Sequence, residues 1–272
     1  MPTGLSPVGP APLRVAVSGA RGRTGREVVA ALEADPGFEC VASIGSDEEL
    51  GTALRESAAR VLVDFTTPAS ALGNALAAAQ LGVSPVVGTS GVAGSGVDRI
   101  RDACEAAGIG GCVIANFALG AALLMWLAEL CAPHFEGCEI VETHHPGKLD
   151  APSGTALRTA ERLLAARDGR AFGHPEPVTT PLAGTRGGSL GGAGVHSLRL
   201  EGAVADQSVV FGALGQTLTL THRTTARSSF APGVLLAARA VVETGRFLDT
   251  LEEVLGLPSA AAIRRGMGSS EA

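Results

Sequence analysis

Short apolar runs alternate with longer amphipathic stretches along the chain up to residue 117. The runs are bounded by Gly, Pro or polar residues and predict buried strands, whereas apolar positions recurring every three or four residues predict helices. The expected strands are 13–18, 38–44, 60–64, 84–87 and 111–115, and the expected helices are 26–34, 47–58, 69–81 and 96–107. This alternation predicts an α/β fold with a Rossmann-like parallel sheet covered on both faces.

The pattern changes after the apolar stretch 117–131, which is short for a membrane span and predicts a buried helix. Further strands are expected at 139–143, 195–200, 208–211 and 217–223, with one helix at 154–167 and a Gly- and Pro-rich connection at 170–194. This half predicts an α+β domain with a mixed or antiparallel sheet. Because an open sheet face needs covering, we expect oligomerisation through it. A last helix at 231–244 is expected to pack back on the first domain.

Three glycines, Gly19, Gly22 and Gly25, lie between the first strand and the first helix. Their spacing, Gly-x-x-Gly-x-x-Gly, is a variant of the commoner Gly-x-Gly-x-x-Gly of dinucleotide-binding turns. Such a turn lets backbone N–H groups approach a pyrophosphate at the helix start, and Arg21 and Arg23 can add positive charge. Tight turns also collect glycine, so the flanking strand and helix carry the inference. The polar tips at 64–67, 88–91 and 115–117 are expected to share one rim with this turn.

The connection 142–155 combines two adjacent histidines, a lysine and a Ser-Gly-Thr turn. Ser153 is placed to cap the following helix, whose free N–H groups suit a carboxylate. Lys148 can hold a second carboxylate or donate a proton. The paired imidazoles titrate near neutral pH and are suited to giving a proton to a substrate, although histidines in loops are more often structural. Adjacent histidines seldom ligate one ion and no acid or cysteine spacing completes a zinc set, so no metal site is expected.

Composition narrows the classes of function. A formal net charge of -6 gives no global basic footprint for nucleic acid. The five cysteines lack CxxC spacing and predict free thiols in a reducing compartment. Residues 1–12, rich in Pro and Gly, predict a disordered leader and not a signal peptide. We therefore expect a cytoplasmic protein that binds neither nucleic acid nor membranes.

Several segments together resemble the dihydrodipicolinate reductase (4-hydroxy-tetrahydrodipicolinate reductase) family of bacterial lysine and diaminopimelate biosynthesis. The matching segments are 19–25, 63–66, 88–91, 115–117, 142–156, 196–199 and 227–230. They span nearly the whole chain, and the block at 142–156 is close to diagnostic.

The resemblance implies NADPH- or NADH-dependent reduction of a dicarboxylate, 4-hydroxy-tetrahydrodipicolinate, through its dehydrated imine to tetrahydrodipicolinate. By similarity His144 is the proton donor and Lys148 a second donor or carboxylate clamp. The implied substrate-binding residues are His145, Ser153, Gly154 and Thr155. The implied cofactor-binding residues are Gly19, Ala20, Arg21, Gly22, Arg23, Thr24, Gly88, Thr89, Ser90, Ala115, Asn116 and Phe117. The family is typically a homotetramer assembled through its C-terminal sheet.

The expected organisation follows from these assignments. The dinucleotide-binding domain comprises 13–117 and 228–272, and the domain for substrate binding and oligomerisation comprises 118–227. At the end of the second strand, Gly45 stands where the family usually has an acid that binds the ribose. A 2′-phosphate then meets less repulsion, but no arginine is supplied to hold it; NADPH is favoured, with use of NADH also open.

Two alternatives stay open at this point. The chain can be a related NAD(P)H oxidoreductase acting on another imine or keto dicarboxylate, which a substrate panel would reveal. It can also be a non-catalytic dinucleotide-binding protein, which loss of His144 or Lys148 would have favoured.

Overall fold

The computed structural model describes residues 11–173 and 179–268 of the chain. They form two compact units: unit 1 contains the described residues up to Phe117 together with Arg227–Leu255, and unit 2 contains Ala118–Ala226 and the described residues from Gly256 onward. The predicted leader lies almost entirely outside the described residues. The sequence analysis assigned residues 228–272 to the dinucleotide-binding domain. Helix α9 (Ala260–Gly268) instead belongs to unit 2. There it packs against α5 (Leu119–Cys131), and the indole N–H of Trp126 donates to the carbonyl of Pro258 at 2.9 Å.

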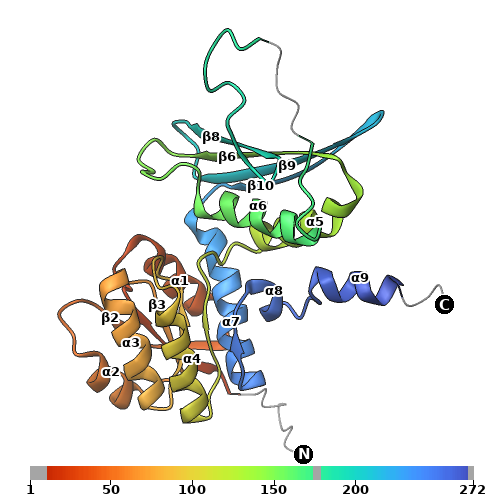
Figure 1. The fold of residues 1–272 in the computed structure, drawn as a ribbon. Helices are drawn as coiled ribbons and strands as arrows, with labels where there is room; N and C mark the ends of the chain where they lie inside the picture. The colour runs from red at the N-terminus through yellow and green to blue at the C-terminus, as the bar shows by residue number, and fades with distance from the viewer. Residues whose placement is uncertain (1–10, 174–178, 269–272) are drawn as a thin grey trace, which may run out of the picture. The chain divides into compact units, whose positions relative to one another are not determined.

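Unit 1 is built on a six-stranded sheet in the order β11-β5-β4-β3-β1-β2 (Figure 1). All its pairings are parallel, which confirms the predicted Rossmann-like sheet. The strands are β1 (Leu13–Ser18), β2 (Phe38–Ile44), β3 (Val61–Asp64), β4 (Ser84–Val87), β5 (Gly111–Val113) and β11 (Phe247–Leu248). Strands β3 and β4 are buried along their whole length, as expected for strands covered on both faces.

The helices of unit 1 follow the predicted order. They are α1 (Arg23–Ala34), α2 (Leu50–Ser57), α3 (Pro68–Gln80), α4 (Ser95–Ala107), α7 (Ala231–Thr244) and α8 (Leu251–Val254), with a short 3₁₀ turn η2 (Arg227–Phe230) before α7. Helix α2 begins later than predicted because the carboxylate of Glu49 accepts hydrogen bonds from the N–H groups of Gly51 and Thr52 and so caps the helix there. Helix α7 packs on β3, β4 and β5, as expected for the returning helix.

Unit 2 is built on a five-stranded sheet in the order β10-β9-β6-β8-β7. Its strands are β6 (Gly137–His144), β7 (Gly188–Leu190), β8 (Ala193–Arg199), β9 (Ala205–Ala213) and β10 (Gln216–Thr224). The β6–β8 pairing is parallel and the others are antiparallel, so the sheet is mixed. Strand β7 lies inside the segment that the sequence predicted as a plain connection.

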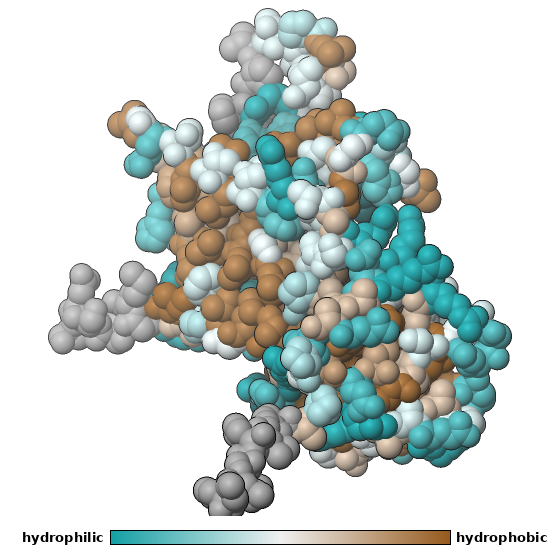
Figure 2. All heavy atoms as spheres, turned by 180° about the vertical axis from the view of Figure 1, so that it is seen from behind, coloured by the Kyte–Doolittle hydropathy of each residue, from teal (hydrophilic) through white to brown (hydrophobic). Residues whose placement is uncertain are grey.

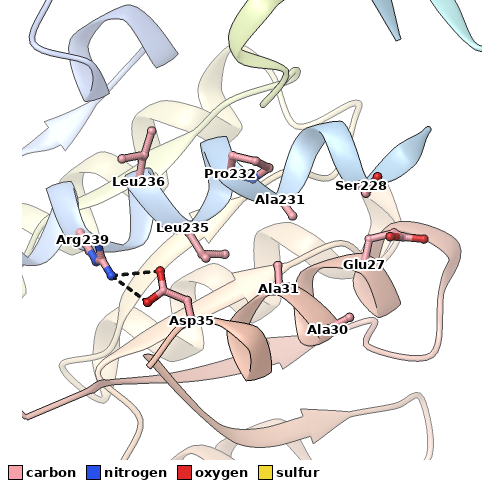
Figure 3. A pocket seen from close by; sticks show the side chains of 10 residues that line it. All are labelled: Glu27, Ala30, Ala31, Asp35, Ser228, Ala231, Pro232, Leu235, Leu236 and Arg239. Carbon is pink, nitrogen blue, oxygen red and sulfur yellow. Dashed lines mark hydrogen bonds and ion pairs between the residues drawn. The ribbon is translucent and has the colours of Figure 1, made fainter. Parts of the chain in front are cut away.

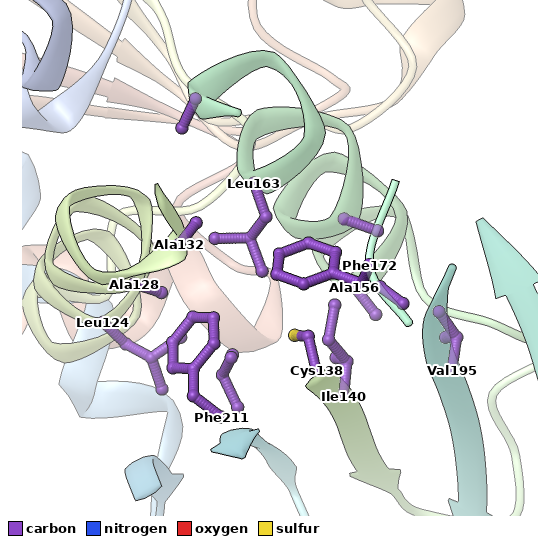
Figure 4. Close-up of a cluster of buried hydrophobic side chains, with 14 residues drawn as sticks. Leu124, Ala128, Ala132, Cys138, Ile140, Ala156, Leu163, Phe172, Val195 and Phe211 are labelled. Atoms are coloured by element: carbon purple, nitrogen blue, oxygen red, sulfur yellow. The ribbon is translucent and has the colours of Figure 1, made fainter. Parts of the chain in front are cut away.

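One face of this sheet carries α5 and α6 (Gly154–Ala166) (Figure 1). Alternate residues of β6 and β9 point toward these helices, among them Ile140 and Phe211, which are fully buried (Figure 4). Leu163 of α6 fills the same cluster, and the ring of Phe135, just after the 3₁₀ turn η1 (Ala132–His134), stacks on Phe211 at 5.3 Å. This apolar layer fixes β6 and α6 against each other, and the connection 142–155 runs between them.

Helix α5 has buried and exposed apolar residues, and its 13 residues make it short. In the described part of the chain, none of the helices has both the length and the apolar character needed to cross a membrane.

Candidate active site

The glycine turn of unit 1 is closely packed. Gly19 has a φ of 76°, and a Cβ on it would lie 2.5 Å from the carbonyl oxygen of Phe65. A Cβ on Gly25 would collide with the backbone of Gly19. Gly22 is the N-cap of α1 and offers no side-chain hydrogen bond to its first turn. The helix start is therefore open to an anion, which fits the pyrophosphate of a dinucleotide.

A buried carboxylate joins the ends of β3 and β4 beside this turn. Asp64 accepts hydrogen bonds from the hydroxyls of Thr66 at 2.8 Å and Thr89 at 2.7 Å, and from the amide of Asn74 at 2.8 Å. The ring of Phe65 lies so close to Gly88 that any side chain there would collide with it. These contacts place the predicted tips at 19–25, 64–67 and 88–91 along one rim.

In the tips at 88–91 and 115–117, some side chains are buried and others are exposed. Phe117 is 1% exposed and meets Phe65 edge to face, with 6.1 Å between ring centroids. Thr89 is 7% exposed, with its hydroxyl directed at Asp64. The side chains of Phe117 and Thr89 therefore support the rim from inside, and only their backbone can face a ligand. Ser90 and Ala115 are exposed.

An arginine stands at the end of β2, where the sequence suggested that none was supplied. Arg21 reaches across from the glycine turn and forms ion pairs with Asp47 at 2.8 Å and Glu48 at 3.5 Å. A Cβ on Gly45 would lie 2.9 Å from the guanidinium carbon of Arg21. The glycine therefore makes room for the arginine. The sequence analysis did not predict an arginine at the end of β2, because Arg21 comes from the glycine turn 19–25 and reaches β2 only in the folded chain.

In unit 2, His144 is the last residue of β6 and lies at the start of the predicted connection. Its Nδ1 is 2.5 Å from Oε2 of Glu142, and its side chain is 15% exposed. Ser153 caps α6 as predicted, with its hydroxyl accepting from the N–H of Ala156 at 3.2 Å. The backbone N–H of Ser153 donates to Oε1 of Glu142 at 3.2 Å. One carboxylate therefore ties the histidine to the helix start.

Glu142 also binds Arg199 of β8. The NH1 and NH2 groups of Arg199 lie 3.0 Å from Oε2 and Oε1 of Glu142, a bidentate pair. Glu142 is fully buried, and burial alone would raise the pKa of its carboxyl group. Hydrogen bonds from Arg199, Ser197 and His144 outweigh burial and hold the pKa below its usual value. Glu142 is therefore ionised in the neutral range.

Lys148 is held by a neighbouring acid. Its Nζ lies 2.8 and 3.0 Å from the two carboxylate oxygens of Asp150, and this hydrogen bond is the main cause that lowers the pKa of Asp150. The backbone carbonyl of Asp150 accepts from Arg199 at 2.7 Å. Arg199 thus connects the lysine segment with Glu142 and His144.

The structure brings together His144, Lys148 and Ser153 through Glu142 and Arg199, two residues that the sequence did not single out. One signal was present: alternation along β6 places Glu142 on the same buried face as Ile140, an unusual position for a carboxylate. Among the other predicted residues, His145 is half-buried and its carbonyl accepts from the N–H of Lys148, while Gly154 is exposed and Thr155 half-buried at the first turn of α6.

Two surface cavities are lined mainly by other residues. One of about 580 Å³ separates α1 and α7, where Arg239 pairs with Asp35 at 3.2 Å (Figure 3). The other, about 650 Å³, lies in unit 2 and is lined by Pro152, Ser197 and the segment 184–190 among others. Neither is lined by a residue predicted for the site, although the second adjoins the connection 142–155 at Pro152.

Comparison with known proteins agrees with the predicted resemblance. The family models for the N-terminus and the C-terminus of dihydrodipicolinate reductase match residues 13–117 and 120–255. The 4-hydroxy-tetrahydrodipicolinate reductase of Moorella thermoacetica is 43% identical over 265 residues, covering 90% of this chain and 98% of that protein. The enzyme of the same name from Streptomyces coelicolor is 46% identical over 248 residues, with the same shares covered.

A solved structure agrees as well. The dipicolinate-bound dihydrodipicolinate reductase from Paenisporosarcina sp. TG-14 matches with a TM-score of 0.82 and 33% identity, covering 89% of this chain and 99% of that one. Both halves of the chain are thus matched by the models of one family. The chain belongs to the dihydrodipicolinate reductase family.

Proposed function

We propose that this protein reduces 4-hydroxy-tetrahydrodipicolinate, through its dehydrated imine, to tetrahydrodipicolinate with a nicotinamide cofactor. The observation that carries the proposal is the arrangement of unit 2, in a chain of this family. A histidine held by a buried carboxylate lies beside a capped helix start and a lysine. These groups suit a doubly negative ring that must receive a proton.

The rim of unit 1 is the proposed cofactor site. The open start of α1 after Gly22 and the guanidinium of Arg21 suit the phosphates, and the tips ending at Ser90 and Phe117 complete the rim. When bound there, a reduced nicotinamide would supply the hydride. The chain's own contribution is to hold the phosphates and to keep the ends of β3 and β4 in place through Asp64.

The start of α6 and Lys148 are the proposed partners of the two substrate carboxylates. The N–H groups of Gly154 and Thr155 lie in the first turn, where the helix dipole favours a negative group. Lys148 can exchange part of its contact with the largely exposed Asp150 for a second carboxylate. His145, beside them, is proposed to contact the same substrate.

His144 is the proposed proton donor. Reduction of the ring leaves a carbon that needs one proton, and an imidazolium placed beside it both stabilises the developing negative charge and supplies that proton. Because Nδ1 of His144 is engaged with Glu142, Nε2 is the atom left for this transfer.

NADPH is the proposed preferred cofactor, with NADH also used. Arg21 stands beside Gly45 and is half exposed or more, so it can leave Asp47 and Glu48 for a 2′-phosphate. We further propose that the protein works in the cytoplasm as a homotetramer. Its partly or fully buried free cysteines support the first part, and the face of its second sheet that none of the described helices covers supports the second.

The decisive experiment follows NADPH and NADH oxidation by the pure protein with freshly prepared 4-hydroxy-tetrahydrodipicolinate. We expect turnover with the wild type, and a loss of about 10²-fold or more in kcat for His144→Gln. Cofactor affinity, measured by fluorescence titration, should stay nearly unchanged. The control His134→Gln removes another imidazole, an exposed one in the 3₁₀ turn η1, and should retain activity.

No turnover by the wild type, or turnover only with a different imine or keto dicarboxylate in a substrate panel, would contradict the proposed substrate. Unchanged kcat in His144→Gln would remove His144 from its role.

A further inference from the structure

We infer that Glu142 and Arg199 act together as positioning residues for His144. Glu142 fixes the ring with its proton on Nδ1, so that Nε2 is the atom that gives and regains the catalytic proton. Arg199 offsets the charge of Glu142, so that the imidazolium still releases that proton. The inference rests on the proposed role of His144.

The geometry settles the direction of the hydrogen bond to the ring. Glu142 is ionised, and an ionised carboxylate only accepts hydrogen bonds. At 2.5 Å from Oε2, Nδ1 must therefore carry the hydrogen, in the imidazolium and in the neutral ring alike. The second oxygen of Glu142 accepts from Ser153 N–H and Arg199, which locks the carboxylate in place. The ring consequently has one orientation and one tautomer.

Arg199 reduces the effect of the Glu142 carboxylate on the acidity of His144. A buried anion paired with His144 alone would hold the imidazolium proton tightly and make the ring a poor acid. The guanidinium lies 3.0 Å from both carboxylate oxygens and neutralises the same anion. The register supports this arrangement, because Arg199 is the residue of β8 that pairs with His144 of β6.

Charged groups near His144 on β9 and in the connection have other partners. Its neighbour on β9 is Ala205, which carries no charge. Asp206, the next residue of β9, pairs with Thr143 and accepts from the N–H of Thr224 at 3.0 Å. In the connection, Lys148 is paired with Asp150. Glu142 and Arg199 are thus the charges that bear on the ring most directly.

A second Glu–His–Arg set on the same strand provides a matched control. Glu139 lies three residues earlier, so it points to the opposite face of the sheet. Its Oε2 is 2.8 Å from Nε2 of His196, and its Oε1 is 2.7 Å from NH2 of Arg186. The residue types are the same, but this set does not bond to the connection 142–155. Glu139→Gln therefore removes a Glu–His–Arg set of the same residue types, at a more exposed position, without breaking a contact of the connection.

The test compares Glu142→Gln, Arg199→Met, Arg199→Lys and Glu139→Gln in the full-length protein. For each we would measure kcat and KM across pH, and the ring ¹⁵N shifts of histidine-labelled protein, with His144→Gln to assign the signal. We expect the neutral ring of wild-type His144 to be the Nδ1–H tautomer. Glu142→Gln should lose this preference and about 10²-fold in kcat, with a much smaller change in KM.

The two partners should shift the pH profile in opposite directions. Without the carboxylate the imidazolium loses its stabilising anion, so the alkaline fall of kcat moves to lower pH in Glu142→Gln. Without the guanidinium the anion acts on the ring alone, so the fall moves to higher pH in Arg199→Met, with a lower rate at neutral pH. Arg199→Lys keeps the charge and should restore most of the profile, and Glu139→Gln should match the wild type.

The outcomes separate this inference from the proposed function. An Nε2–H tautomer in the wild type overturns the inference even where a variant fails to fold. So do shifts of the two profiles in the same direction, or equal losses in Glu142→Gln and Glu139→Gln. A wild-type protein that is inactive but has the Nδ1–H tautomer would contradict the proposed function while upholding the placement of the ring.

Discussion

The absence of a side chain at Gly45 shapes the end of β2 as much as any residue that is present. An acid at this position would occupy the space now taken by the guanidinium of Arg21. Arg21 instead bridges to Asp47 and Glu48, two exposed acids on the loop after β2. Exposed ion pairs contribute little to stability, so a phosphate can replace them at low cost.

Cofactor preference should depend on this arginine. Arg21→Met is expected to reduce kcat/KM with NADPH by about tenfold or more, the scale of one lost charge-assisted contact, and to change kcat/KM with NADH much less. Steady-state kinetics with both cofactors measures the ratio. Arg26→Met, on the exposed side of α1, serves as the control. A strong NADH preference in the wild type would contradict the proposed use of NADPH.

The cysteines provide a separate prediction at this scale. Burial raises the pKa of Cys104 to about 11 and that of Cys138 to about 12, so both are protonated at pH 8 and poor nucleophiles. Cys40 and Cys131 are only partly buried. We expect iodoacetamide at pH 8 to label Cys40 and Cys131 first and the buried Cys104, Cys112 and Cys138 only on unfolding, as read by peptide mass spectrometry. Early labelling of Cys138 in folded protein would show that the core of unit 2 opens.

Single residues show where the sequence was informative and where it was not. His144 and Lys148 stood out because they share a short polar connection, and the Ser153 cap followed from the helix after it. Glu142 and Arg199 stayed hidden, since their meaning depends on which strands are neighbours. The parallel pairing of β6 with β8, separated by a helix and a long connection in sequence, creates that contact.

At the scale of elements, strong patterns were predicted nearly to the residue. Strands β1, β2 and β4 and helix α7 have the expected bounds, because apolar runs and amphipathic stretches there end at Gly, Pro or charged residues. Strands β11 and β7 were missed. Two or three residues carry no detectable period, and both strands exist because a longer neighbour offers them hydrogen bonds.

The packing of α7 gives a stability prediction with a built-in control. A Cβ on Gly233 of α7 would collide with the backbone carbonyl of Phe117, whereas a Cβ on Gly73 of α3 meets nothing within 4 Å. We expect Gly233→Ala to lower the free energy of unfolding by about 1–3 kcal/mol, as overpacking does. Gly73→Ala should raise it by about 0.5–1 kcal/mol, since alanine favours the helix. Urea unfolding measures both, and equal effects would contradict the described contact.

At the scale of the whole molecule, the described helices leave one face of the second sheet open. Among the described residues, helices pack only against the side that bears Ile140 and Phe211, while Val141, Val210 and Thr219 lie on the other side. Figure 2 shows that hydrophobic residues also gather on the back of the part formed by unit 2. Exposed leucines of α5, Leu123 and Leu127, add to the apolar surface of this unit.

Assembly through the open sheet face is therefore expected. Light scattering after size exclusion should give about four times the chain mass of 27.2 kDa. Thr219→Arg adds a charge at an exposed position of β10 and should dissociate the tetramer without unfolding the monomer, because the position is already solvent-accessible in one chain. Gln80→Arg, at the exposed end of α3, should leave the mass unchanged. A monomeric wild type, or an intact Thr219→Arg tetramer, would contradict this interface.

The chain leaves unit 1 at Phe117 and returns to it at Arg227, and this path has a consequence for biosynthesis. When residues up to 117 have emerged from the ribosome, α7, which packs on β3, β4 and β5, has not yet been translated. Part of the sheet of unit 1 therefore stays without α7 until residues 118–226 have been synthesised. Unit 1 can therefore be completed only after residues 118–226 have been synthesised, and unit 2 only after α9, which follows the last residues of unit 1 in the chain.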